Sequence, residues 1–176
     1  EGFMSWDPEF EVAFNPRTIA VVGASTKPQW MGGTTFISNL QGLGFPGSIY
    51  PINPKAEGAE IRGLKVYPNL VSVPEPIDLV IISIPALAVP AVLEDCIAAN
   101  ARNIHIFTAG FEETGEEEGI GLGKSIREIA KRGGLRVVGP NCMGLHVPAA
   151  RISTLETARS ESGPVAFLSQ SGAFAG

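Results

Sequence analysis

The sequence predicts an α/β protein in which helices cover both faces of a mostly parallel sheet. Short apolar runs rich in β-branched residues alternate with longer stretches whose apolar residues recur at helical spacing. Glycine and proline, 21 and 14 of the 176 residues, mark the boundaries between these stretches. Such alternation with short connections favours right-handed crossovers, which place helices on both faces of a parallel sheet.

Five apolar runs predict the strands. They are TIAVV at 18–22, SIYPIN at 48–53, DLVIISIP at 78–85, NIHIF at 103–107 and LRVVG at 135–139. An apolar run without polar alternation is typical of a parallel strand that is buried on both faces. Pro51 argues against a regular interior position for the second run, because proline cannot donate a hydrogen bond to the ladder.

Three stretches between these strands predict helices, at 34–44, 89–99 and 117–132. In the first, Phe36, Ile37 and Leu40 fall on one helical face, and Gly42 and Gly44 are stop signals. The complete order of strands and helices indicates a Rossmann-like, doubly wound fold.

The chain divides into four parts by composition. We expect an N-terminal extension at 1–13, the Rossmann-like domain at 14–146 and a polar linker at 147–163. The last part, PVAFLSQSGAFAG at 164–176, begins a new strand and turn that has no sheet of its own. We therefore expect it to be the beginning of a second, truncated domain.

The composition excludes several classes of function. A net charge of −5 and a pI near 5.1 argue against a general nucleic-acid or membrane-surface binder. Cys96 and Cys142 make neither a disulfide framework nor a metal-ligand spacing, which favours a reducing compartment. With no apolar run of about 18 residues and no signal-peptide pattern, we expect a cytoplasmic protein.

The residues that follow each strand are the candidates for a ligand site, because open parallel sheets bind ligands at the carboxyl ends of their strands. Gly23, Ala24, Ser25 and Thr26 follow the first strand. A glycine there allows a tight turn, the hydroxyls can donate hydrogen bonds, and the start of the next helix attracts a phosphate. A G-x-G-x-x-G pattern is absent, so a plain glycine turn with a serine or threonine cap remains an alternative.

Lys55 follows the second strand, where an NAD site would have an acidic residue. A lysine suits a phosphate on the adenosine ribose, which NADP and coenzyme A (CoA) both carry; the alternative is a solvated turn lysine. After the third strand, Pro85 ends the ladder and lets the backbone pass close to a flat ring.

The sequence offers no convincing catalytic residue or metal site. The glutamates of EETGEEEG at 112–119 suit a solvated helix start, where the helix dipole favours negative charge. His105 lies inside a predicted strand and is expected to be a packed core histidine. Cys142 is expected to be a small buried turn residue, and no Ser/His/Asp set or carboxylate pair has the spacing for catalysis.

Six segments at the strand ends carry a family resemblance when taken together. In chain order they are FNPRTIAVVGAS, YPINPKAEG, DLVIISIPA, TAGFEETGEEEG, GPNCMG and SQSGAFAG. From about Phe14 to the last residue, the chain resembles the N-terminal CoA-binding domain of NDP-forming acyl-CoA synthetases, such as ADP-forming acetyl-CoA synthetase, which are related to the succinyl-CoA synthetase alpha subunit. One departure is STKPQWMGG at 25–33, which is longer and carries the bulkier Trp30.

The resemblance implies a role for each segment in binding CoA. The Gly23 loop would hold the CoA phosphates and Lys55 the phosphorylated ribose. The adenine and ribose of CoA would lie against Ser83, Ile84 and Pro85. The pantetheine arm would pass along Thr108, Ala109 and Gly110. Asn141 would brace the turn after the last strand.

The resemblance also implies an acid–thiol ligase as the parent protein. Acyl-CoA, ADP and phosphate would be interconverted with acid, CoA and ATP through acyl phosphate and phosphohistidine. The histidine and the ATP-grasp module that uses ATP/ADP with Mg would lie in other domains or a partner subunit, so this chain would be inactive alone. Ser169–Gly172 resembles the turn into the helix that steadies the phosphohistidine.

Two other functions remain open at this point. A non-catalytic CoA-sensing domain of a regulatory protein, such as a protein lysine acetyltransferase, would use the same residues. An NADP-dependent dehydrogenase would also want Lys55, but the missing G-x-G-x-x-G pattern and the missing substrate domain count against it.

Overall fold

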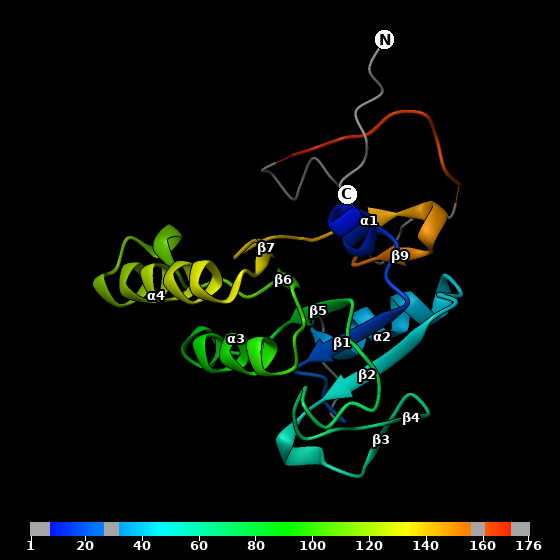
Figure 1. Cartoon of the computed structure of the whole chain (residues 1–176), viewed down its shortest axis with the longest axis horizontal. Helices are drawn as coiled ribbons and strands as arrows, with labels where there is room; N and C mark the ends of the chain where they lie inside the picture. The colour runs from blue at the N-terminus through cyan, green and yellow to red at the C-terminus, as the bar shows by residue number, and fades with distance from the viewer. Residues whose placement is uncertain (1–7, 27–31, 156–160, 170–176) are drawn as a thin grey trace.

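The central sheet has five parallel strands in the order β2-β1-β5-β6-β7 (Figure 1). The computed structural model describes residues 8–26, 32–155 and 161–169. The strands are β1 (Thr18–Val22), β2 (Ser48–Ile52), β5 (Leu79–Ile82), β6 (Asn103–Ile106) and β7 (Arg136–Val138), which confirms all five predicted runs. This is a doubly wound order, and its topological switch point lies between β1 and β5.

Helices cover both faces of the sheet, as the sequence predicts. α2 (Gly33–Gly42) packs on one face, whereas α3 (Val89–Ala98) and α4 (Glu117–Gly133) lie side by side on the other (Figure 1). α4 ends where Gly134 adopts a left-handed conformation, with φ 62°. The connections are therefore the crossovers that a mostly parallel sheet requires.

Strand β1 shows why the strand runs have no polar alternation. Ile19 and Val21 pack on the α2 side, and Ala20 and Val22 pack on the side of α3 and α4. All four side chains are at most 5% exposed. Each fully buried Val or Ile contributes about 1.5–3 kcal/mol, so a polar residue on either face would be costly.

Pro51 lies in β2, which is an edge strand of the sheet. On the side of β2 that faces away from β1, the described residues form one isolated β-bridge, between Ile52 and Tyr67. An edge position is where proline is tolerated in a sheet, and the sequence-based argument against an interior position is confirmed.

Two small antiparallel hairpins were not predicted. One joins β3 (Glu60–Ile61) to β4 (Leu64–Lys65), and the other joins β8 (His146–Val147) to β9 (Ile152–Ser153). The second hairpin includes the first residues of the expected linker at 147–163, and these residues are folded against α2. Ile152 is 1% exposed, and the Asn39 amide of α2 donates to the Thr154 carbonyl at 3.4 Å.

The described segments nearest the two ends of the chain, 8–14 and 161–169, contribute no strand to the central sheet. A short helix, α1 (Pro8–Phe14), falls mostly within the expected N-terminal extension. Residues 161–169 are exposed and contain neither helix nor strand, although a strand was expected to begin at 164 as part of a second domain. A strand without a partner leaves its backbone groups unpaired, so it is not stable alone. The domain boundaries at 147 and 164 remain predictions.

Three of the expected features lie wholly or partly outside the described residues: Trp30, residues 170–172 of the turn that begins at Ser169, and the residues of the extension before 8. Within the described ranges, no helix combines the length and apolar character that crossing a membrane would need. In the same part of the chain, no three His, Cys, Asp or Glu side chains are grouped closely enough to hold a metal ion.

Candidate functional site: the carboxyl rim of the sheet

The carboxyl rim consists of the residues that follow the five strands: 23–26, 53–55, 83–85, 108–110 and 139–141. At the switch point the exit of β1 lies directly against the exit of β5, and Gly23 adopts φ +95° there. A Cβ atom on Gly23 would lie 2.0 Å from the Ser83 carbonyl oxygen and 2.8 Å from the Ile84 side chain. Only glycine therefore lets the exits of β1 and β5 come this close.

The start of α2 is fastened to the loop that follows β1. The Thr34 hydroxyl donates to the Ser25 carbonyl at 2.7 Å and accepts from the Ser25 N–H at 2.9 Å. A Cβ atom on Gly33 would lie 2.6 Å from the Ala24 nitrogen, so helix and strand exit are in direct contact. Gly33 thus takes the close-packing part that the last glycine has in a G-x-G-x-x-G loop.

Asn53 connects the exits of β1 and β2. Its amide nitrogen donates to the Ala24 carbonyl at 2.7 Å, and its amide oxygen accepts from the Lys55 N–H at 2.9 Å. Both ends of the side chain are therefore used, which fixes the short turn that carries Lys55. The Lys55 side chain itself is exposed at the rim.

Thr108 joins the exits of β5 and β6. Its hydroxyl, on a residue 9% exposed, donates to the Ile84 carbonyl at 2.7 Å and accepts from the Ile84 N–H at 3.2 Å. The backbone N–H of Asn141 donates to the Thr108 carbonyl at 2.9 Å, which ties the exit of β7 to the same point. Gly110 donates its N–H to the Glu113 carboxylate at 2.6 Å.

His105 lies beneath the turn at 139–144. It is 1% exposed, and its Nε2 donates to the Cys142 carbonyl at 2.8 Å. Because that carbonyl can only accept, Nδ1 carries the lone pair, and it has no hydrogen-bond partner among the described residues. Burial lowers the pKa of His105, and the bond to Cys142 opposes this to a smaller extent. The histidine is a core residue, as the sequence predicts, whereas Cys142 is half-buried rather than buried.

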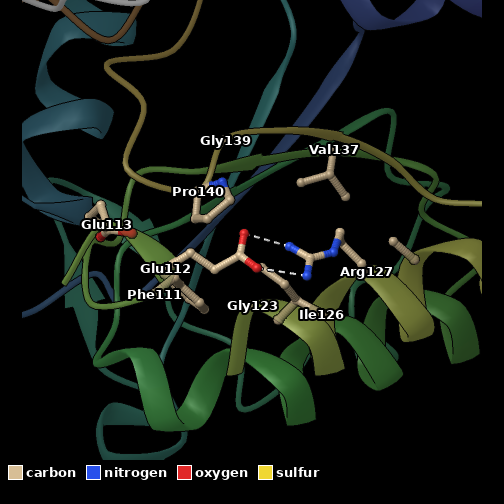
Figure 2. Close-up of a pocket in the computed structure, with 10 residues that line it drawn as sticks. Phe111, Glu112, Glu113, Gly123, Ile126, Arg127, Val137, Gly139 and Pro140 are labelled. Carbon is tan, nitrogen blue, oxygen red and sulfur yellow. Dashed lines mark hydrogen bonds and ion pairs between the residues drawn. The ribbon is translucent and has the colours of Figure 1, made fainter. Parts of the chain in front are cut away.

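A pocket of about 360 Å³ lies beside the rim, between α4 and the end of β7. Phe111, Ile126 and Val137 give it an apolar lining (Figure 2). At its mouth the Arg127 guanidinium holds both oxygens of Glu112, at 2.6 and 2.7 Å. This ion pair lowers the pKa of Glu112, and the glutamates at 112–118 are exposed as expected.

The structure brings the predicted site residues together along one edge of the sheet. Strand exits that are distant in sequence are joined there by the bonds at Gly23, Asn53 and Thr108. Sequence reasoning missed Gly33, Thr34 and Asn53. For Asn53, its place directly after a strand was an available signal; the partners of the other two depend on how α2 docks.

The fold places the chain among the Rossmann-like α/β domains, which bind their ligands at this end of the sheet. The family model described as "CoA binding domain" matches residues 17–148, and the chain belongs to this family. The resemblance found in the strand-end segments is thereby confirmed.

Several curated relatives of the chain are ADP-forming CoA ligases. The chain is 39% identical over 166 residues to the ADP-forming acetate–CoA ligase I subunit alpha of Pyrococcus furiosus. This match covers 93% of the chain and 36% of that protein. The chain is 40% identical over 165 residues to the ADP-forming acetate–CoA ligase I of Archaeoglobus fulgidus, covering 93% of this chain and 23% of that protein. The chain therefore spans about a third or less of these relatives.

Solved structures share the fold. The acetyl-coenzyme A synthetase 1 of Candidatus Korarchaeum cryptofilum, in complex with phosphate and ADP, is 42% identical with a TM-score of 0.74; the match covers 82% of this chain and 30% of that one. A Pyrococcus horikoshii protein is 38% identical with a TM-score of 0.84, covering 94% of this chain and 37% of that one.

Proposed function

We propose that the chain binds CoA along the carboxyl rim and serves as the CoA-binding domain of an ADP-forming acyl-CoA synthetase. The switch point between β1 and β5 carries this proposal, because open parallel sheets bind ligands outside the strand ends at this point, and Gly23 lets the two strand exits meet there without a side chain between them. The N–H groups of the first turn of α2 have no partner within the helix and suit the pyrophosphate of CoA.

The remaining predicted residues take their roles from their positions on the rim. Ser25 and Thr26 would donate to the phosphates, and Lys55 would meet the phosphate on the ribose. Ser83 to Pro85 lie across the switch point from this loop, where a flat adenine could rest against the backbone. The path from Thr108 to Gly110 leads on towards Asn141 and would hold the pantetheine arm. Thr108 contributes shape and backbone there, because its hydroxyl is bonded to Ile84.

The parent reaction would join CoA binding to transfer of a phosphoryl group. An acyl-CoA, ADP and phosphate would give acid, CoA and ATP through an acyl phosphate and a phosphohistidine carried elsewhere in the enzyme. The part of this chain is to bind CoA and orient its thiol. The 176-residue chain alone is expected to form no ATP from acetyl-CoA, ADP and phosphate.

Calorimetry with CoA and dephospho-CoA tests the proposal. Lys55→Ala removes the charge expected to face the ribose phosphate and should weaken CoA binding about tenfold, with little effect on dephospho-CoA. Lys124→Ala, an exposed lysine of α4, is the charge-matched control and should leave both affinities unchanged. Equal weakening of both ligands by Lys55→Ala would refute the assignment of this lysine, and absence of CoA binding to the unaltered protein would refute the proposed function.

A further inference from the structure

The pocket between α4 and β7 is a cavity to which the proposed CoA contacts assign no role. It measures about 360 Å³ and lies between one face of α4 and the exits of β6 and β7 (Figure 2). β7 is the last strand of the sheet, and in the described part of the chain no further strand pairs with its outer edge. The volume lies within the range of small-molecule sites, which start at about 300 Å³.

The interior of the pocket is apolar. Phe111 is 0% exposed and Ile126 is 4% exposed, and both belong to the hydrophobic cluster on the α3 and α4 side of the sheet. Val137 of β7 packs against the same cluster, and Ala130 lies one turn beyond Ile126 along α4. These side chains have no polar atoms, so a ligand would be held here by the burial of hydrocarbon.

The charged side chains that line the pocket are engaged with partners. Arg127 holds both carboxylate oxygens of Glu112, at 2.6 and 2.7 Å (Figure 2). Glu113 accepts a hydrogen bond from the Gly110 N–H at 2.6 Å. The lining therefore has two carboxylates and one guanidinium, which is already paired. A ligand whose buried end is negatively charged would be disfavoured, because its charge would have no partner.

The pocket opens where the thiol end of a bound CoA would arrive. The position of this end rests on the proposed function, in which the pyrophosphate lies at the loop after β1 and the pantetheine arm passes 108–110. From β1 to β7 the sheet has three inter-strand steps, which together measure about 14–15 Å. The arm has about 13 chain bonds between phosphorus and sulfur, and these reach about 14–16 Å when extended. The sulfur would therefore lie at the exit of β7, where Gly139 and Pro140 line the pocket.

The size and the lining of the pocket together define the acyl group that fits. We propose that the pocket binds the acyl group of an acyl-CoA and selects uncharged hydrocarbon chains longer than acetyl. An acetyl group has one methyl beyond the carbonyl and would occupy only the mouth, whereas a hexanoyl chain would extend along Ile126 and Val137 towards Ala130. Each further methylene that is buried should strengthen binding about fourfold.

Calorimetry of the protein with a series of CoA thioesters tests this inference. The ligands are CoA, acetyl-CoA, butyryl-CoA and hexanoyl-CoA. Affinity should increase with chain length, and hexanoyl-CoA should bind at least tenfold more tightly than acetyl-CoA. Adipyl-CoA has a chain of the same length that ends in a carboxylate, and it should lose this gain because the pocket offers the charge no free cation.

Two variants separate the pocket from general effects of a larger apolar side chain. Ala130→Leu fills the deep end of the pocket and should remove most of the gain of hexanoyl-CoA, while the affinities for CoA and acetyl-CoA stay unchanged. Ala98→Leu makes the same change at the exposed end of α3 and should leave all the affinities unchanged. Unchanged CoA binding by Ala130→Leu also shows that the variant is folded.

Amide NMR of the unaltered protein gives the same answer if Ala130→Leu does not fold. Replacing acetyl-CoA by hexanoyl-CoA should shift the amides at 123–130 and 137–139, while those at 23–26 stay in place.

Several results would overturn the inference. They are equal affinities for acetyl-CoA and hexanoyl-CoA, equal binding of hexanoyl-CoA and adipyl-CoA, an equal effect of Ala98→Leu, and amide shifts only outside 123–130 and 137–139. CoA binding that does not depend on chain length would refute the acyl pocket alone. Absence of binding by every ligand of the series would refute the proposed function and the acyl pocket with it, so the two failures are distinguishable.

Discussion

Replacing Gly23 by alanine is the sharpest test of the switch-point geometry. The backbone of Gly23 has φ +95°, a region that costs a residue with a side chain about 1–2 kcal/mol. The new Cβ atom would also lie 2.0 Å from the Ser83 carbonyl oxygen. Because backbone atoms of two central strands must then separate, overpacking adds about 1–3 kcal/mol. The free energy of unfolding should fall by about 2–5 kcal/mol in total.

Thermal unfolding followed by circular dichroism measures this loss. For a chain of this size each kcal/mol lowers Tm by about 2–4 °C, so a decrease of roughly 4–20 °C is expected. Gly121→Ala is the matched control: Gly121 lies inside α4, and a Cβ atom there would have no neighbour within 4 Å. The control should gain about 0.5–1 kcal/mol from its helix propensity. A Gly23→Ala protein within about 0.5 kcal/mol of the unaltered one would show that β1 and β5 do not approach as described.

Three further substitutions or treatments test other parts of the domain. Asn53→Ala removes both bonds that join the exits of β1 and β2, and should lower the free energy of unfolding by about 1–3 kcal/mol and weaken CoA binding; unchanged values in urea unfolding and calorimetry would contradict the connecting role. Burial lowers the pKa of His105, so just below about pH 6.5 the unfolded state binds more protons than the folded state, and the free energy of unfolding decreases as the pH decreases. His105→Gln should flatten this part of the plot of stability against pH. An identical slope in the variant would rule out the histidine as its source. Burial raises the pKa of Cys96 to about 12, so iodoacetamide should label the half-buried Cys142 well before Cys96 in the native protein, a difference that mass spectrometry detects and that equal labelling would disprove.

The sequence was sufficient to predict the sheet and its main helices because each buried parallel strand is a continuous apolar run. β1 occupies the predicted residues 18–22, and β2 lies at an edge of the sheet, in agreement with the argument from Pro51 against a regular interior position. Chain order does not determine which strands are neighbours, but the exits of parallel strands must lie at one edge. The candidate residues of the rim could therefore be named before their spatial arrangement was known.

The features that were missed depend on contacts between distant segments. The hairpin of β8 and β9 has only two paired residues in each strand, too few for a hydrophobic period, and Ile152 is buried only because α2 lies beneath it. The strand expected at 164 was assigned to a second domain, and among the described residues 161–169 Leu168 is 98% exposed and no strand lies beside it. Likewise, nothing in the sequence indicates that the Thr34 hydroxyl bonds both the N–H and the carbonyl of Ser25.

The two hydrogen bonds between Thr34 and Ser25 have a consequence for how the sequence and length of the loop between them can vary. These bonds hold Ser25 and Thr34 at a fixed separation, whatever residues connect them along the chain. Lengthening a loop between fixed ends costs little, about 0.6 kcal/mol for each doubling. Natural variants could thus exchange or extend the segment between Ser25 and Thr34, and so change which ligand is bound, without disturbing the sheet and α2. Grafting loops of other lengths between the same two residues would measure how much variation in length the domain tolerates.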